Sequence, residues 1–257
     1  MNRVSVCIDM MFSNFDFYER FEQVKKCGIN TVEFWKWSNK DIDKICGILK
    51  KLNMNVSIFN VDSSNEKLSA DLSRGIINDG RSDEFVRATE QSIPVYKKLG
   101  AKAMIVLIGD TNEYNRDNVY KCLKAVQPIL ERENVTIIVE PLNATDRVGY
   151  SMPYAKPVFD VLRDINSPNI KMLYDIYHQN MTGDFNIDDI QKNIDIIGHF
   201  HVADAPGRHE PGTGNIDYVT ILNQIKKMPY NGCTGLEYRA TKPDCETLGF
   251  LKEVYNV

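Results

Sequence analysis

The stretch VTIIVE at residues 135–140 shows the pattern that decides the fold, because it is a short apolar run that ends on a carboxylate. Three later runs repeat it: IKMLYD (170–175) ends on Asp175, IIGHFH (196–201) on His201, and CTGLE (233–237) on Glu237. Each run is rich in β-branched or aromatic residues, as expected for a strand that is buried on both faces. If the runs are successive parallel strands, their last residues meet at one end of the sheet.

Four more strand candidates precede these runs, and helical patterns lie between them. The earlier candidates are VSVCI (4–8), TVEF (31–34), NVSIFN (55–60) and AMIVLI (103–108). Apolar residues recur at helical spacing within 17–24, 42–52, 85–99, 119–130, 154–162, 187–194, 218–225 and 248–254. Gly28 and Gly100 follow two of these patterns at the positions where helices stop. Alternating strands and helices with short connections predict parallel strands and right-handed crossovers.

Eight such repeats favour a closed (β/α)8 TIM barrel over an open doubly wound sheet. A dinucleotide-binding sheet would have a glycine-rich turn after its first strand, and CIDMMFSNF (7–15) contains no glycine. The length of 257 residues is close to the roughly 250 of one barrel, so we expect a single domain over residues 1–257. Longer polar stretches at 61–82 and 203–217 follow the third and seventh strands, on the side where barrels carry their sites.

Composition argues against several classes of function. The formal net charge of −4 gives no basic surface for a nucleic acid. No run approaches the roughly 20 apolar residues that cross a bilayer. The apolar run near the start of the sequence is too short for the core of a secretory leader. The six cysteines are scattered without a CxxC pair, which indicates a reducing compartment. We therefore expect a cytoplasmic protein whose partner is a small molecule. The sequence is also compatible with a homo-oligomer.

The four strand-end residues Glu140, Asp175, His201 and Glu237 form a candidate site for a divalent metal. Three carboxylates gathered in a confined space would repel one another without a cation. The mixed oxygen and nitrogen set suits manganese or magnesium first, and cobalt, iron and zinc are also compatible with it. His199 lies on the same strand face as His201. We choose His201 as the ligand because it is nearer the end of the strand, and the reverse assignment stays open.

The sequence around these positions resembles a known family. EPLN follows the fifth strand, DIYH the sixth, GHFHVAD with GRHEPGTG the seventh, and LEYR the eighth. In combination these motifs are similar to the xylose isomerase-like barrels, and most of all to the hydroxypyruvate isomerase family. The resemblance implies that Glu140, Asp175, His201 and Glu237 hold the metal. It also implies that Glu140 and Glu237 are the catalytic acid and base, and that His178 and Arg208 contact substrate oxygens.

The resemblance implies an isomerase that interconverts hydroxypyruvate and tartronate semialdehyde, or a close analogue, through a metal-stabilised enediolate. His201 is a departure, because hydroxypyruvate isomerases often carry glutamine at this position whereas the related ketose 3-epimerases carry histidine. A ketose 3-epimerase is therefore the alternative. An apurinic-site endonuclease would need more histidines than the four of this chain. A non-catalytic sugar-binding barrel would not need both glutamates.

Overall fold

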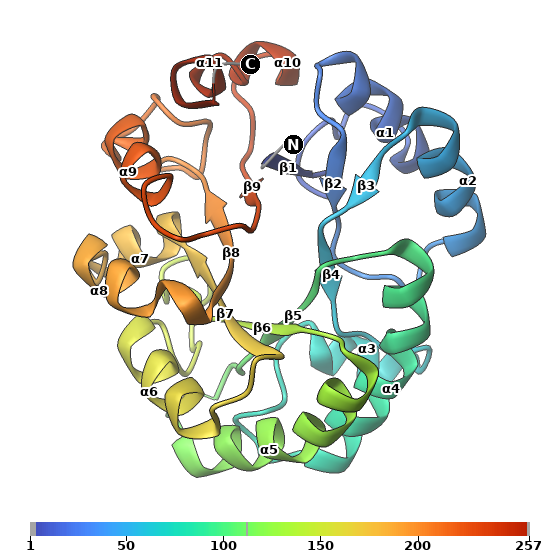
Figure 1. Cartoon of the computed structure of the whole chain (residues 1–257), viewed down its shortest axis with the longest axis vertical. Helices are drawn as coiled ribbons and strands as arrows, with labels where there is room; N and C mark the ends of the chain where they lie inside the picture. Colours follow the sequence, from blue (N-terminus) through green and yellow to red (C-terminus); the bar gives the residue numbers. More distant parts are fainter. Residues whose placement is uncertain (1–3, 112, 256–257) are drawn as a thin grey trace.

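The computed structural model describes residues 4–111 and 113–255, except for the side chains of 252, 253 and 255, and shows a parallel β-barrel ringed by helices (Figure 1). The strands are β1 (Val4–Cys7), β2 (Thr31–Glu33), β3 (Asn55–Val56), β4 (Ile58–Asn60), β5 (Ala103–Leu107), β6 (Ile137–Glu140), β7 (Ile170–Asp175), β8 (Ile197–Val202) and β9 (Thr234–Leu236). Their order in the sheet is β3-β2-β1-β9-β8-β7-β6-β5-β4. The first and last strands pair in parallel, and the predicted TIM barrel is confirmed.

The third strand of the barrel is interrupted at one residue, Ser57, which separates β3 from β4. β3 pairs with β2, and β4 pairs with β5. Ser57 connects the two sides, because its N–H donates to the Val32 carbonyl at 2.9 Å and its carbonyl accepts from the Lys102 N–H at 2.7 Å. The sequence predicted one strand over 55–60, and the chain follows that path while changing its pairing partner halfway. This change brings the two edges of the sheet together.

Alternation along the strands decides which side chains enter the barrel. The interior apolar layer comprises Ile58, Ala103, Ile105, Ile138 and Leu173. In β6, Val139 packs in the outer layer against the helices, whereas Ile138 belongs to the interior. Because side chains two residues apart share a face, Glu140 lies on the interior side with Ile138. The same alternation in β8 places His199 and His201 inside.

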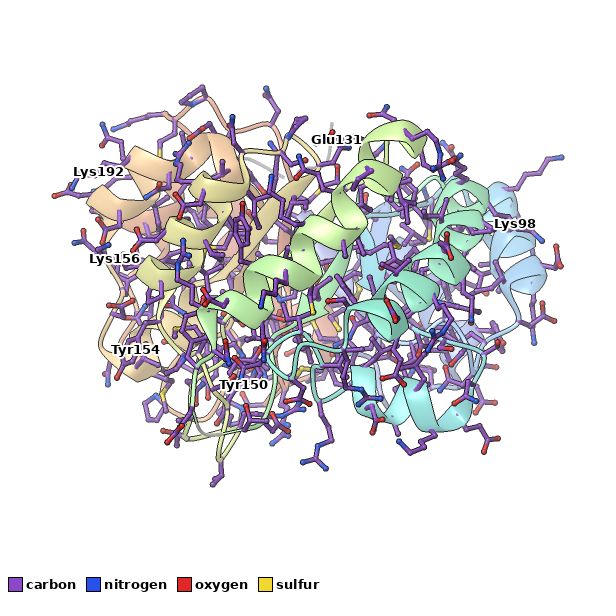
Figure 2. All side chains as sticks on the ribbon, turned by 90° about the horizontal axis from the view of Figure 1, so that it is seen from below. Lys98, Glu131, Tyr150, Tyr154, Lys156 and Lys192 are labelled. Carbon is purple, nitrogen blue, oxygen red and sulfur yellow. A yellow bond between two sulfur atoms is a disulfide. The ribbon has the colours of Figure 1, made fainter. Side chains whose placement is uncertain are left out.

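The helices cover the outside of the barrel (Figure 1). They are α1 (Phe17–Lys26), α2 (Ile42–Leu52), α3 (Glu66–Leu72), α4 (Ser82–Leu99), α5 (Arg116–Glu133), α6 (Ala155–Ile165), α7 (Ile176–Thr182), α8 (Ile187–Asn193), the 3-10 turn η1 (Ile194–Ile196), α9 (Tyr218–Ile225), α10 (Asp244–Thr247) and α11 (Phe250–Tyr255). Three short helices, α3, α7 and α10, were not predicted. Figure 2 shows Lys98, Lys156 and Lys192 projecting outward from α4, α6 and α8. None of the described helices combines the length and apolar character needed to cross a membrane.

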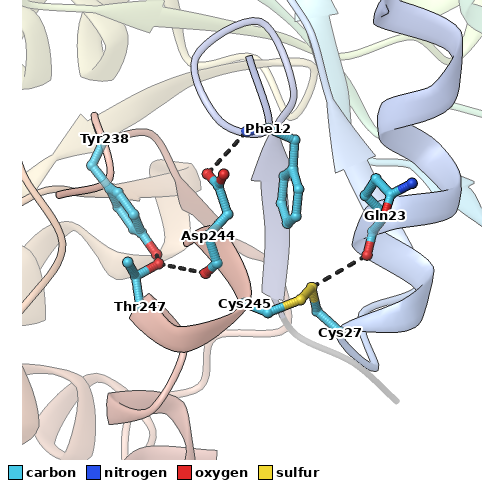
Figure 3. The surroundings of a disulfide bond; sticks show 7 residues. All are labelled: Phe12, Gln23, Cys27, Tyr238, Asp244, Cys245 and Thr247. Carbon is cyan, nitrogen blue, oxygen red and sulfur yellow. Dashed lines mark hydrogen bonds between the residues drawn. A yellow bond between two sulfur atoms is a disulfide. The ribbon is translucent and has the colours of Figure 1, made fainter. Parts of the chain in front are cut away.

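A disulfide joins Cys27 and Cys245, whose Cα atoms are 5.4 Å apart although 218 residues separate them in sequence (Figure 3). Cys27 directly follows α1 and Cys245 lies in α10, so the bond ties the first βα unit to the last. Beside it, the Asp244 carboxylate accepts a hydrogen bond from the Phe12 N–H at 2.9 Å. The scattered cysteine spacing did not predict this bond. The disulfide argues against a reducing compartment, an expectation that rested on that spacing and on the missing leader-like run and that stays a prediction.

Candidate metal and active site

Four side chains at the C-terminal ends of neighbouring strands converge inside the barrel mouth. Glu140, Asp175 and His201 lie in β6, β7 and β8, and Glu237 follows β9 directly. All four are buried, and one ligand atom from each lies within 4.8 Å of the others. In the sheet register, Asp175 pairs with His201, which explains why their side chains emerge at the same level. The structure therefore brings together the complete set that the sequence predicted.

Polar atoms in this cluster lack hydrogen-bond partners within the described part of the chain. Glu140 Oε1 and His201 Nδ1 are buried and make no hydrogen bond. The two atoms are 3.6 Å apart, and Nδ1 is 3.2 Å from Glu237 Oε2. Unsatisfied buried polar atoms and closely spaced carboxylates both cost free energy. One divalent cation held by the four side chains would remove both costs, so the donor set fits such an ion.

The cluster gives its two glutamates opposite electrostatic surroundings. Burial raises the pKa of Glu140 to about 7, and the charges of Glu237 and Asp175 act in the same direction. Burial also opposes ionisation of Glu237, but the charges of His201 and Arg208 outweigh it and hold the pKa of Glu237 well below its ordinary value. Carboxylate pairs whose pKa values are pushed apart in this way are typical of sites that need both an acid and a base.

Asp175 also builds the short helix that carries His178. Its Oδ1 accepts hydrogen bonds from the N–H groups of Tyr177 at 2.8 Å and His178 at 3.3 Å, and so caps α7. The Asn143 N–H donates to His178 Nδ1 at 3.1 Å, which leaves the ring proton on Nε2. Burial lowers the pKa of His178 to about 4, so the ring is neutral at pH 7. His178 lines the cavity and offers an Nε2–H donor that makes no hydrogen bond to a described residue.

Arg208 reaches the same cluster from the loop after β8. Its Nη2 contacts Glu237 Oε2 and lies 3.5 Å from Asp175 Oδ2. Arg208 has a φ of 56°, a left-handed conformation that a non-glycine residue keeps only where its surroundings hold it. The buried carboxylate of Asp204 helps to fix this loop, because it accepts a hydrogen bond from the Gly212 N–H at 2.8 Å. The structure thus places both predicted substrate residues, Arg208 and His178, beside the cluster.

Two residues near the end of β2 also contact the cluster. Trp35 Nε1 donates a hydrogen bond to Glu237 Oε1 at 2.8 Å. Glu33 Oε1 lies 2.9 Å from His201 Nε2, on the opposite side of the imidazole from Nδ1. The sequence analysis missed Glu33, although TVEF carries a related signal, a carboxylate one residue before the end of a strand-forming run.

The cluster opens into a cavity of about 990 Å³ whose wall is more basic than acidic. The basic side chains are Lys36, Lys40, Arg74, Arg147, Arg208 and Arg239, and the acidic ones are Asp9, Glu140, Asp146 and Glu237. Arg74 and Arg147 are both paired with Asp110. The guanidinium of Arg239 has no ion pair or hydrogen bond to the described residues. The cavity therefore offers basic groups to an anionic ligand.

Comparisons with known proteins give independent information on the fold and the reaction class. Residues 21–254 match the family model described as xylose isomerase-like TIM barrel. The chain is 30% identical over 246 residues to hydroxypyruvate isomerase of Escherichia coli (strain K12), covering 93% of this chain and 94% of the relative. It is 24% identical over 259 residues to 2-oxo-tetronate isomerase of Cupriavidus necator, covering 98% of both. A solved structure described as AP endonuclease, family 2, from Brucella melitensis superimposes with a TM-score of 0.88 at 26% identity over 98% of each chain.

Proposed function

Because the chain belongs to the xylose isomerase-like TIM barrel family, we propose that it is a divalent-metal-dependent isomerase of a small keto acid, hydroxypyruvate or a close analogue. One observation carries the proposal. Glu140 and Glu237 come from two different strands and share a buried cluster with Asp175 and His201, with ligand atoms within 4.8 Å of one another. Relatives named hydroxypyruvate isomerase and 2-oxo-tetronate isomerase support the reaction class.

The proposed reaction moves one proton between neighbouring carbons of the substrate. A carboxylate removes a proton from C3 of hydroxypyruvate, which leaves an enediolate, and the proton returns to C2. The hydroxyl proton passes from the oxygen on C3 to the oxygen on C2. C3 is thereby oxidised to an aldehyde and C2 is reduced to an alcohol, so the product is tartronate semialdehyde and no external oxidant is needed. When bound, the divalent cation would supply a Lewis acid that stabilises negative charge on the substrate oxygens.

The contacts of the two glutamates suggest how they divide the work. Both oxygens of Glu237 are engaged, Oε1 by Trp35 and Oε2 by Arg208. Oε1 of Glu140 has no hydrogen bond to a described residue, so we assign the proton transfer between carbons to Glu140. Glu237 faces the cluster from β9 and completes the acid and base pair. A positioned carboxylate base contributes about 10²- to 10⁴-fold to the rate.

The basic wall of the cavity supports an acidic substrate. Arg208 presents a planar fork that can bind a carboxylate through two hydrogen bonds. His178 would donate its Nε2–H to a substrate oxygen. A ketose 3-epimerase is the second candidate, and the imidazole of His201 in the cluster is the observation that favours it. In that reaction one glutamate removes the proton and the other returns it to the opposite face of the same carbon.

The decisive experiment combines metal exchange with proton NMR in heavy water. Protein stripped with a chelator is reconstituted separately with Mn²⁺, Mg²⁺, Co²⁺ and Zn²⁺, and is incubated with hydroxypyruvate or with a neutral ketose. Diamagnetic Mg²⁺ or Zn²⁺ samples are read directly, and Mn²⁺ samples after the metal has been removed. Conversion to tartronate semialdehyde with deuterium at C2 supports the isomerase, whereas inversion at C3 of the ketose identifies the epimerase.

Two variants and a matched control test the assigned roles. Glu140→Gln and Glu237→Gln should each lower turnover by at least about 10²-fold, because the amide cannot carry the proton. Glu210→Gln is the control, because Glu210 lies in the adjacent loop and its carboxylate accepts from the Thr241 N–H at 2.9 Å instead of joining the cluster. Full activity in the metal-stripped protein, or in Glu140→Gln, would contradict the proposal.

A further inference from the structure

We propose that Glu33 is a positioning residue that holds the imidazole of His201 with Nε2 toward itself and Nδ1 toward the carboxylate cluster. The inference rests on the proposed function only in that the cluster binds a divalent cation. It does not depend on which substrate is used.

Glu33 is enclosed at the centre of the barrel, with 2% of its surface exposed. Its Oε2 atom has three polar neighbours: it accepts from Ser5 Oγ at 2.7 Å and Ser57 Oγ at 3.1 Å, and it lies 3.1 Å from His199 Nε2. Oε1 has one close polar contact, His201 Nε2 at 2.9 Å. This contact is short but too bent for a hydrogen bond, so neither atom has a hydrogen-bond partner among the described residues. The carboxylate is thus fixed through Oε2, and Oε1 is directed at His201.

The imidazole of His201 therefore lies between two groups of carboxylates. Nε2 faces Glu33, while Nδ1 is 3.2 Å from Glu237 and 3.6 Å from Glu140. A neutral imidazole has one N–H donor and one lone pair. A proton held on Nε2 by Glu33 leaves the lone pair of Nδ1 directed at the cluster, as a cation ligand requires. Such outer carboxylates fix the ring orientation and the tautomer of ligating histidines.

Glu33, His199 and His201 do not form a second cation site of their own. The three residues offer close ligand atoms, but Oε2 of Glu33 is already occupied by two serine hydroxyls and His199. Only Oε1 of Glu33 remains, and it faces His201 Nε2. The same imidazole already directs its Nδ1 at the cluster of Glu140, Asp175 and Glu237. The arrangement holds the imidazole through a close polar contact and offers too few open ligands for an ion.

Because Gly235 in β9 has no side chain, it leaves room for the carboxylate of Glu33. A Cβ atom at Gly235 would lie 2.4 Å from Glu33 Oε1, 2.7 Å from Oε2 and 2.7 Å from His199 Nε2. All three distances are too short for non-bonded contact, so an alanine there would displace the carboxylate. Gly235→Ala therefore disturbs the position of Glu33 without replacing any ligand of the cluster.

The test measures cation affinity instead of turnover. Free Mn²⁺ is quantified by electron paramagnetic resonance during titration of the folded protein, and a thermal unfolding scan confirms that each variant is folded. We expect Glu33→Ala and Gly235→Ala to raise the Mn²⁺ dissociation constant by about 10- to 100-fold. Glu33→Gln should retain most of the affinity, because its amide oxygen still presents a lone pair to His201 Nε2. Glu210→Ala is the matched control, since Glu210 is a buried carboxylate that accepts from the Thr241 N–H and lies outside the cluster.

The outcomes separate this inference from the proposed function. A folded Glu33→Ala or Gly235→Ala protein with the wild-type Mn²⁺ dissociation constant overturns the positioning role. Equal losses in Glu33→Gln and Glu33→Ala also overturn it, because they would show that charge alone matters. A wild-type protein that binds Mn²⁺ but isomerises no keto acid refutes the proposed function and leaves the role of Glu33 standing. A wild-type protein that binds no divalent cation removes both.

Discussion

The disulfide between Cys27 and Cys245 should make a large contribution to stability, and its removal is the most quantitative test that the fold offers. The bond closes a loop of 218 residues. For a loop of that length, the entropy that a cross-link removes from the unfolded chain corresponds to about 5 kcal/mol, and measured values are typically about 2 to 4 kcal/mol. We expect Cys245→Ser to lower the free energy of unfolding within this range. With a urea m-value of about 3 kcal/mol per M, the midpoint should fall by about 1 M.

The assay is urea denaturation without reductant, followed by circular dichroism and paired with a thiol count. Unfolded, unreduced protein should show four reactive thiols from Cys7, Cys46, Cys122 and Cys233, and six after reduction. Cys46→Ser is the control, because Cys46 is half-buried and outside the disulfide. Wild-type protein in dithiothreitol should behave as Cys245→Ser does. Six reactive thiols without reductant, or equal midpoints for the two serine variants, would refute the reasoning.

Three further predictions concern the groups around the cluster. Trp35→Phe removes the hydrogen bond to Glu237 and should lower kcat/KM by about tenfold. Hydrogen bonds to charged groups are worth about 1.5 to 3 kcal/mol, and the lower end applies because Trp35 is partly exposed. An unchanged kcat/KM would show that the indole only covers the mouth of the barrel. Arg208→Lys should raise KM about tenfold because a single ammonium replaces a two-pronged fork, and a loss confined to kcat would contradict this. His178→Phe should lower kcat/KM at least about tenfold with an unchanged Mn²⁺ dissociation constant, and weaker metal binding would show that His178 is a ligand.

The convergence of the four cluster residues could be predicted because it follows from two local rules. Parallel strands align their C-terminal ends, and side chains alternate between faces with a period of two. Glu140, Asp175 and His201 are each the last or second-last residue of a strand, and Glu237 follows its strand directly. The boundaries of these strands shifted by one or two residues relative to the sequence prediction without affecting the result, because the face of each residue stayed the same.

The remaining features depend on contacts that the sequence does not encode locally. Glu33 in β2 and His201 in β8 belong to strands that are not neighbours in the sheet, and they meet only across the barrel interior. Alternation predicts that both point inward, but it does not say which interior residues touch. The pairing of Cys27 with Cys245 has the same origin, since it depends on β1 lying beside β9. Helix α7 was missed because Asp175 ends a strand and caps a helix at once, so no loop residues mark the boundary.

The position of Glu33 bears on whether the residue type at position 201 indicates the substrate. By family resemblance, glutamine at this position is typical of hydroxypyruvate isomerases and histidine of ketose 3-epimerases. A carboxylate such as Glu33 accepts a hydrogen bond from an imidazole N–H or from an amide N–H, and in either case the far end of the side chain presents a lone pair to the cluster. The two residues are then alternative ways of building the same ligand, so a histidine at position 201 is compatible with a keto-acid substrate as well as with a ketose. We expect the substrate to contact the rim, where Arg208 and Arg239 line the cavity. We therefore base the choice of a keto acid on the charge of that wall and not on the ligand at position 201.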